Sequence, residues 1–275
     1  MDKPVNRPIK RSKVRYQAAR LLHTGERYLA WLVLHKHLAK KRGQEILPYV
    51  HSEHETVLLR QLKDVDMIWQ HNKIRNLKIA ASRLDGVVVH PSETFSYWKL
   101  IGRPTYKKGY LDGVVLQSGH VIHGCGGGLC QLSNLIYWMT LHTQLTVTER
   151  HRHGYDVFPD SARTQPFGSG ATCFYPYGDL MIKNNTQQDF QLCVRVGDTC
   201  LEGAWRSDEK SMFRYEIVEK NHHFNGEYWG GFSRHNALYR RACDLDGTFL
   251  GEEFVAENHA LTMYAPLIDE VSNNP

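Results

Sequence analysis

The sequence predicts an α+β fold, with helices in the N-terminal part and an antiparallel sheet in the C-terminal part. Apolar residues recur at helical spacing over residues 14–41 and 72–84, whereas apolar and polar residues alternate over residues 190–196. Between these regions, a Gly-rich loop leads into an apolar segment that suits a buried helix of about three turns. We therefore expect this buried helix to pack on the C-terminal antiparallel sheet.

Residues 14–41 predict a basic amphipathic helix, which Gly43 would end. Residues 1–42 contain 12 Lys/Arg and 2 Asp/Glu, a balance of +10, whereas the other 233 residues contain 22 and 27, a balance of −5. Such an arm can contact anionic lipid or nucleic acid, or remain a solvated helix. We expect no nucleic-acid partner, because no helix-turn-helix or zinc-finger pattern accompanies it.

The location of the protein is predicted from its N-terminal residues. Basic residues recur throughout this region, and its longest apolar run, residues 28–34, is too short to span a bilayer. This pattern predicts a cytoplasmic protein, with peripheral membrane contact through the basic arm as a further expectation.

Two more helices are predicted after the arm, at residues 56–69 and 72–84, and Asp85-Gly86 closes the second. A short strand at 87–89 ends before His90-Pro91, and another strand is expected at 114–117. In the C-terminal half, strands are expected at 190–196, 200–205 and 212–218, with a turn at 244–247. The predicted organisation is an arm and linker at 1–50, a core at 51–205 and a β-rich extension of the same domain at 206–275.

Cys130 is the residue that we expect to carry the chemistry. Four glycines at positions 124, 126, 127 and 128 precede it, and glycine lets a ligand approach the main chain. At the start of a helix, free N–H groups and the helix dipole favour a thiolate and could hold an oxyanion. The segment therefore predicts a nucleophile and an oxyanion site, with Gln131 as a further donor.

A thiolate mechanism also needs a base and a group that orients it. The run Glu149-Arg150-His151-Arg152-His153 follows the predicted helix, and His153 is the favoured base, with His151 in reserve. Asp156 and Asp179 are candidates for the orienting carboxylate, and we select Asp179.

Other interpretations of the same residues stay open. Cys130 could be an inert thiol behind a tight turn, as buried free cysteines are common. The loop could also bind a carboxylate or phosphate without covalent chemistry. A zinc site would use His123, Cys125, Cys130 and either His151 or His153, but its spacing is unusual, and we predict neither a metal nor another cofactor.

Several motifs together resemble the VanW family. They are Phe95-Ser96-Tyr97-Trp98, Gly102, the run from Gly126 to Ser133, the Glu149-Arg150…His153 element and Gly170-Ala171-Thr172. The match extends from about residue 72 to residue 184, and the Gly-Gly-Gly-x-Cys-Gln element is its most specific part. Almost the whole chain resembles the stand-alone, resistance-associated members of the family.

The resemblance implies an accessory protein of vancomycin resistance that acts on peptidoglycan or its precursors. It implies an L,D-transpeptidase-like acyl transferase with Cys130 as nucleophile, and a cell-wall stem peptide or precursor as partner. The binding residues would be the matching motif positions Gly126, Gly127, Gly128, Ser133, Arg150 and Thr172. Many members have an acidic residue where this chain has Gly170, so a helper carboxylate would come from elsewhere. The alternative is a non-catalytic binding module for a wall precursor, with the glycine loop as its anion site.

Overall fold

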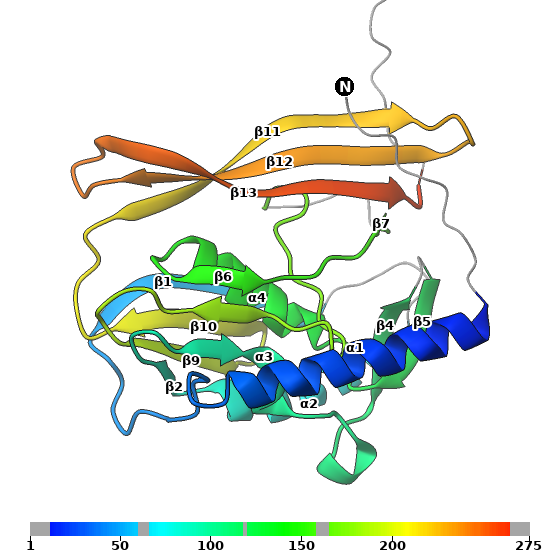
Figure 1. Cartoon of the computed structure of the whole chain (residues 1–275), viewed down its shortest axis with the longest axis horizontal. Helices are drawn as coiled ribbons and strands as arrows, with labels where there is room; N and C mark the ends of the chain where they lie inside the picture. The colour runs from blue at the N-terminus through cyan, green and yellow to red at the C-terminus, as the bar shows by residue number, and fades with distance from the viewer. Residues whose placement is uncertain (1–11, 60–65, 118–119, 158–164, 265–275) are drawn as a thin grey trace, which may run out of the picture.

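The computed structural model describes residues 12–59, 66–117, 120–157 and 165–264, and it has the predicted α+β architecture (Figure 1). Most of the helical residues lie in the first half of the chain and most of the strand residues in the second. The helices are α1 (Lys13–Val33), α2 (Met67–Leu84), α3 (Tyr97–Ile101), the 3-10 turn η1 (Tyr106–Lys108) and α4 (Cys130–Leu141).

The strands form four sheets, and nearly all neighbouring strands are antiparallel. The main sheet has the order β1-β10-β9-β2, and a smaller one has the order β3-β8-β6. Strands β4 and β5 form a hairpin, and the C-terminal sheet has the order β11-β12-β13-β7. Their bounds are β1 (Tyr49–Val57), β2 (Val87–Val89), β3 (Thr94–Ser96), β4 (Asp112–Gln117), β5 (His120–Cys125), β6 (Thr146–Glu149), β7 (Tyr155–Asp156), β8 (Met181–Lys183), β9 (Phe190–Val196), β10 (Cys200–Ser207), β11 (Arg214–Gly226), β12 (Phe232–Cys243) and β13 (Phe249–Thr262).

Helix α4 is buried against the main sheet, as its apolar sequence predicts. It packs on β1 and β10, where Gly203 leaves room for it: a Cβ at that position would lie 2.7 Å from Met139 Cε. The indole of Trp205, also in β10, donates a hydrogen bond to Thr140 Oγ1 at 3.0 Å. These contacts anchor the last turn of α4, the helix whose first residue is Cys130, on the main sheet.

Helix α1 runs along the outside of this body (Figure 1). Arg27 and Trp31 are its buried side chains. The indole N–H of Trp31 donates to Ser96 Oγ at 3.1 Å, and the Arg27 guanidinium donates to the Tyr177 carbonyl at 3.1 Å. One face of the arm is thus docked on the segments around β3 and β8.

Two predicted elements differ in the structure. The helix expected over 56–69 is wrong: residues 49–57 form β1, which gains its hydrogen bonds by pairing with β10, and α2 begins at Met67. Residues 60–65 lie outside the described residues. Helix α1 ends at Val33 rather than near Gly43, because the chain turns there to form bridges at Leu38 and Arg42.

Several other predicted elements are confirmed. The helix expected at 72–84 is the main part of α2, and the strands expected at 87–89 and 190–196 have the predicted bounds. The apolar segment after the glycines is α4, and the turn at 244–247 joins β12 to β13.

The C-terminal strands β11, β12 and β13 are long and form a layer above the body in Figure 1. Side chains of β12 attach this layer to the rest of the chain. Asn236 Nδ2 donates to the Phe167 carbonyl at 2.7 Å, and Arg240 Nη1 donates to the Thr143 carbonyl at 2.7 Å. Arg234 Nη1 lies 3.2 Å from Asp156 Oδ2, and this ion pair is buried.

Among the described residues, no helix combines the length and apolar character that a membrane crossing requires.

Candidate functional site

The glycine loop between β5 and α4 is packed tightly against other parts of the protein. A Cβ on Gly127 would lie 2.2 Å from the backbone of Gly113 in β4, and a Cβ on Gly128 would lie 2.2 Å from Lys73 Cγ in α2. Gly126 and Gly128 also have positive φ angles, +79° and +90°, which side chains disfavour. These contacts correct the interpretation that the glycines leave the main chain open to a ligand, because protein atoms occupy that space.

Cys130 is the first residue of α4, as predicted, and it is half-buried, with its thiol directed at protein atoms. Its Sγ donates a hydrogen bond to the Cys173 carbonyl at 3.6 Å. Burial raises the pKa of Cys130, and backbone hydrogen bonding at Cys173 and at Cys130 itself lowers it by less. The expectation of a thiol acidified by the helix start is therefore wrong: desolvation outweighs the favourable backbone groups.

The neighbours of this thiol are buried. The Tyr97 hydroxyl donates to the Leu129 carbonyl at 2.9 Å. Cys173 lies next to Cys130, so that a thiolate at Cys130 would disfavour ionisation of Cys173. The pKa of Cys173 is raised by burial well above its ordinary value. The half-buried Cys130 therefore borders a buried seam between α4, α3 and the segment that contains Cys173.

The side chains of Gln131 and Ser133 form hydrogen bonds with other residues of the chain. The Gln131 amide donates to Thr56 Oγ1 and to the Val57 carbonyl, both at 2.9 Å, and thereby joins α4 to β1. The Ser133 hydroxyl is buried and donates to the Ala171 carbonyl at 2.6 Å. In this arrangement the Gln131 amide is directed away from an oxyanion on Cys130, and Ser133 is not available to a substrate.

The two candidate bases differ in their surroundings. His153 is half-buried, and burial together with the Arg152 charge lowers its pKa. His151 Nε2 lies 2.8 Å from Glu149 Oε1, and its ring packs edge-on against Phe174. Within the described residues, neither imidazole forms a hydrogen bond with Cys130, so the role of His153 as its base stays a prediction.

The two candidate carboxylates have structural partners. Asp179 is fully buried and accepts hydrogen bonds from the Ser96 hydroxyl and from the Trp98 backbone N–H at 2.9 Å. It thereby fixes the start of α3. Asp156 lies by the C-terminal sheet, next to Arg234 and to the Tyr264 hydroxyl. Neither carboxylate forms a hydrogen bond with His153 in the described part of the chain.

Arg150 and Thr172 also stabilise the backbone. Arg150 Nε donates to the Gly170 carbonyl at 2.8 Å, and its Nη2 contacts the Gly168 carbonyl and Asn258. Thr172 is buried, and its N–H donates to the His151 carbonyl at 2.9 Å. Both residues thus have partners within the chain, and their contact with a substrate stays a prediction.

The structure reveals a cavity that the sequence did not predict, between α1 and the body. It has a volume of about 430 Å³, and Glu149 and His151 line one side of it. The other lining residues come from α1 and from the segment after Thr172: His23, Glu26, Arg27, Ala30, Phe174 and Tyr177. The Glu149-Arg150-His151 motif was the sequence signal for this site. That Arg27 also lines it could be seen only from the fold.

Glu149 is the central charge of this cavity. Burial alone would raise its pKa, but hydrogen bonds from His151 and Arg27, together with the Arg27 charge, make the net shift downward. The Asp179 N–H adds a hydrogen bond of 3.1 Å to the same oxygen. Glu149 is therefore a carboxylate at neutral pH, held between a guanidinium and an imidazole. His151 remains 35% exposed, so a ligand in the cavity can reach it.

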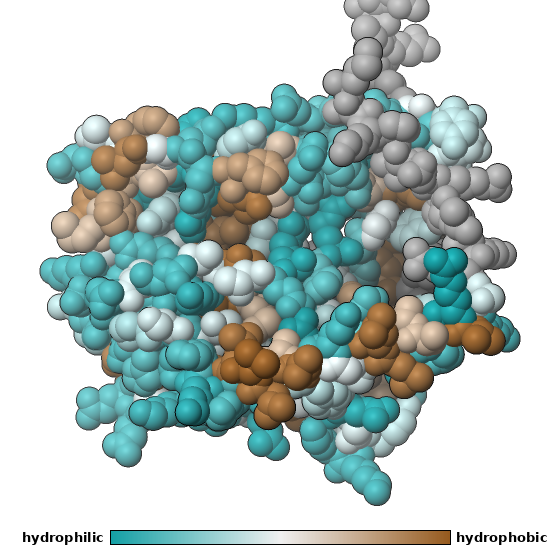
Figure 2. Space-filling view, in the orientation of Figure 1, coloured by the Kyte–Doolittle hydropathy of each residue, from teal (hydrophilic) through white to brown (hydrophobic). Residues whose placement is uncertain are grey.

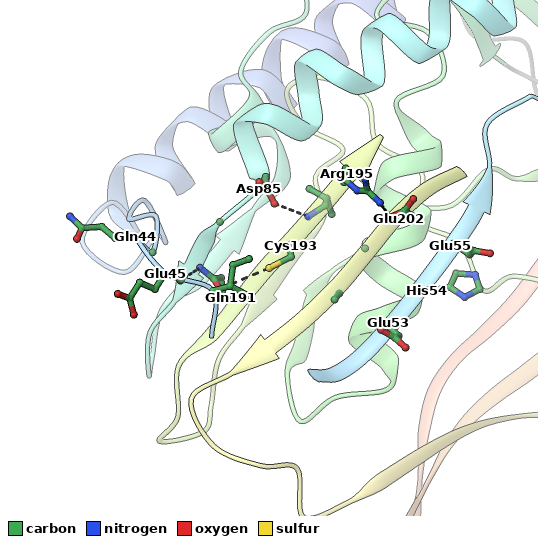
Figure 3. A pocket seen from close by; sticks show the side chains of 16 residues that line it. Gln44, Glu45, Glu53, His54, Glu55, Asp85, Gln191, Cys193, Arg195 and Glu202 are labelled. Carbon is green, nitrogen blue, oxygen red and sulfur yellow. Dashed lines mark hydrogen bonds and ion pairs between the residues drawn. The ribbon is translucent and has the colours of Figure 1, made fainter. Parts of the chain in front are cut away.

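A larger cavity of about 980 Å³ lies on the face of the main sheet that points away from α4 (Figure 3). Several of its polar side chains have partners among the lining residues, either side chains or backbone groups. Arg195 pairs with Glu202 at 2.6 Å, Asp85 accepts from the Val194 N–H at 2.9 Å, and Gln191 Nε2 donates to the Glu45 carbonyl at 3.0 Å. None of the predicted site residues lines it.

The residues of the alternative zinc site do not assemble in the structure. In the part of the chain that is described, no group of three or more His, Cys, Asp or Glu side chains could hold a metal ion. The imidazole of His123 stacks instead on the indole of Trp69, with 4.0 Å between the ring centroids. All six cysteines are free thiols.

Comparison with known proteins identifies the relatives of this chain. The family described as VanW like protein matches residues 72–206. The vancomycin B-type resistance protein VanW of Enterococcus faecalis is 35% identical over 180 residues, which cover 66% of each chain. The protein YoaR of Bacillus subtilis is 29% identical over 140 residues, which cover 50% of this chain and 45% of YoaR. The match thus spans less than two thirds of either relative's length.

No solved structure matches the chain. The family match includes most of α2, all of α4, the cysteine and glycine motif and the Glu149–His151 element, whereas the α1 residues that line the cavity lie outside it. The chain belongs to the VanW-like protein family.

Proposed function

We propose that this chain is an accessory protein of vancomycin resistance that binds a peptidoglycan stem peptide, or its precursor, without forming a covalent intermediate. Its kinship with the Enterococcus faecalis resistance protein supports the link to resistance. The observation that favours binding over catalysis is the state of the motif cysteine. Its half-buried thiol has a raised pKa, whereas the Glu149 carboxylate and the His151 imidazole line a cavity.

The chemistry of this cavity suits a peptide that carries both charges. Arg27 and His151 offer donors to carboxylates and amide carbonyls, whereas Glu26 and Glu149 offer acceptors to an amine. Phe174 adds an apolar surface. A volume of about 430 Å³ lies within the range of small-ligand sites, so we expect the cavity to bind a short part of the stem peptide.

A matched pair of histidine variants tests this proposal. His151→Gln removes an imidazole that lines the cavity, whereas His90→Gln removes an equally exposed imidazole that pairs with Asp189 elsewhere. In calorimetric titration with a soluble muramyl pentapeptide, we expect His151→Gln to weaken binding about tenfold, the value of one hydrogen bond. His90→Gln should bind like the unchanged protein.

The same titration distinguishes the rival assignment, an acyl transferase that uses Cys130. Cys130→Ala should retain the affinity of the unchanged protein, and the intact mass of the unchanged protein should stay constant in the presence of the pentapeptide. Equal affinities for the two histidine variants, or no binding by any form, would contradict the cavity as the binding site. An acyl adduct on Cys130 would favour the enzyme.

A further inference from the structure

The outward face of α1 is apolar along its whole length. Six large apolar side chains on this face are between 61% and 80% exposed, namely Val14, Leu21, Leu22, Leu29, Leu32 and Val33. Seven or eight residues separate Val14 from the Leu21-Leu22 pair and that pair from Leu29, and three or four separate Leu29 from Leu32 and Val33. This spacing keeps all of them on one side of a helix. The opposite side carries the buried residues Arg27 and Trp31, so docking α1 on the body leaves the apolar stripe in solvent.

This stripe is larger than a scattering of single apolar residues. Figure 2 shows apolar side chains gathered along the lower front of the molecule, where α1 runs in Figure 1. A helix of 21 residues is about 31 Å long, and exposed apolar groups repeated along one face of such a helix mark an interaction surface. The partner must therefore be apolar over a long, flat area.

The charges near the stripe indicate the chemistry of that partner. Residues 12–42 contain eight Lys/Arg and a single acidic residue, Glu26. Arg15 lies beside the first apolar residue of the stripe, and Lys36 and Lys40 follow the end of the helix; all three are exposed. A second copy of the chain on this face would bring like charges together, whereas a surface with negative charge would complement them.

We propose that α1 lies flat on an anionic lipid surface, with its apolar stripe at the level of the upper acyl chains and its basic residues on phosphate groups. Basic amphipathic helices bind membranes in this way, through buried apolar area and attraction to anionic lipid together. His23, Arg27 and Ala30 of the same helix line the cavity that contains His151. Membrane contact would therefore hold that cavity beside the lipid surface, and the inference stands whether or not the cavity binds a wall precursor.

Vesicle co-sedimentation of the full chain tests this proposal. We expect binding to vesicles that contain phosphatidylglycerol, weaker binding to vesicles of phosphatidylcholine alone, and a decrease as salt is added, because salt screens the basic residues. The double variant Leu21→Gln/Leu29→Gln should lower the partition coefficient at least about tenfold, since it removes two exposed apolar side chains from the stripe.

A matched control uses Phe249→Gln/Leu250→Gln, which changes two side chains of similar exposure on β13. This control should bind vesicles like the unchanged protein, and circular dichroism shows whether each variant is folded. Equal effects of the two double variants, or no binding to anionic vesicles, would overturn the proposal. Self-association that the α1 variant abolishes, without vesicle binding, would assign the stripe to a second copy instead.

Discussion

The carboxyl groups of Glu149 and Asp179 lie on adjacent segments, yet their pKa values shift in opposite directions. Burial raises the pKa of Asp179 to about 6, and its hydrogen bonds from Ser96 and Trp98 offset only part of that effect. Glu149 has the same burial penalty to a smaller degree but also contacts Arg27 and His151, which make the net shift downward. Glu149 is in direct contact with the Arg27 cation, and this contact explains why the two pKa values shift in opposite directions.

This difference predicts a pH dependence of stability. Because the folded-state pKa of Asp179 lies above its ordinary value of 3.8, its protonated form stabilises the fold below about pH 4. That contribution is lost as the pH rises through about 6. The side chain of the variant Asp179→Asn cannot ionise, so we compare the free energy of unfolding of the unchanged protein with that of the variant. The difference, unchanged protein minus variant, should decrease by up to about 3 kcal/mol as the pH rises from about 4 to about 6.

Urea unfolding at a series of pH values measures this difference, and subtraction cancels the contribution of Glu149, which both proteins share. Above pH 7 the difference should be constant. A difference that rises with pH would mean that Asp179 is more acidic in the folded protein than in the unfolded one.

Residue types were easier to predict than side-chain directions. The sequence located Cys130 at the first residue of a buried helix, and the structure has it there. The sequence could not show that Gln131 donates to β1 or that Ser133 donates to Ala171, because both partners are distant in the chain. Burial of the thiol arises in the same way, from α3 and from the segment around Cys173.

At the scale of the elements, the glycine loop and the strand β1 illustrate what periodicity can and cannot predict. Helices α2 and α4 and strand β9 have apolar residues at regular spacing and were predicted. Strand β1, with the sequence Tyr-Val-His-Ser-Glu-His-Glu-Thr-Val, has polar residues on both faces, and its conformation depends on pairing with β10. Tertiary pairing of this kind overrides local propensity.

The loop also provides a direct test of packing. Gly127→Ala would place a Cβ against the backbone of Gly113, which cannot move as a flexible side chain would. We expect it to lower the free energy of unfolding by about 1–3 kcal/mol or more, the usual cost of overpacking. Gly124→Ala is the matched control, because its Cβ would make only an ordinary contact of 3.6 Å with Val115.

Chemical denaturation of both variants measures the two costs, and the control should change stability by less than about 0.5 kcal/mol. If Gly127→Ala were as stable as Gly124→Ala, the loop would have free space beside it, and the interpretation of the glycines as a ligand site would regain support.

At the scale of the whole molecule, the motifs that resemble the VanW family converge on one buried seam. Tyr97 binds the residue before Cys130, Asp179 fixes the start of α3, and Arg150 holds Gly170. The sequence predicted the α+β class and singled out these motifs. It could not predict that α1 docks over the Glu149–His151 pair and creates a cavity, because Arg27 is 122 residues from Glu149 in the chain.

The central claim is that the motif cysteine belongs to this buried scaffold and is not an ionised nucleophile. Alkylation of Cys130 across a series of pH values tests it most directly, with Cys200, which is half-buried like Cys130, as the reference in the same protein. Peptide mass spectrometry quantifies the labelling of both. We predict that Cys130 reacts more slowly than Cys200, with an apparent pKa above the ordinary thiol value of about 8.5, because burial raises it. Fast labelling of Cys130 with an apparent pKa below 7 would contradict the account and assign the site to covalent catalysis.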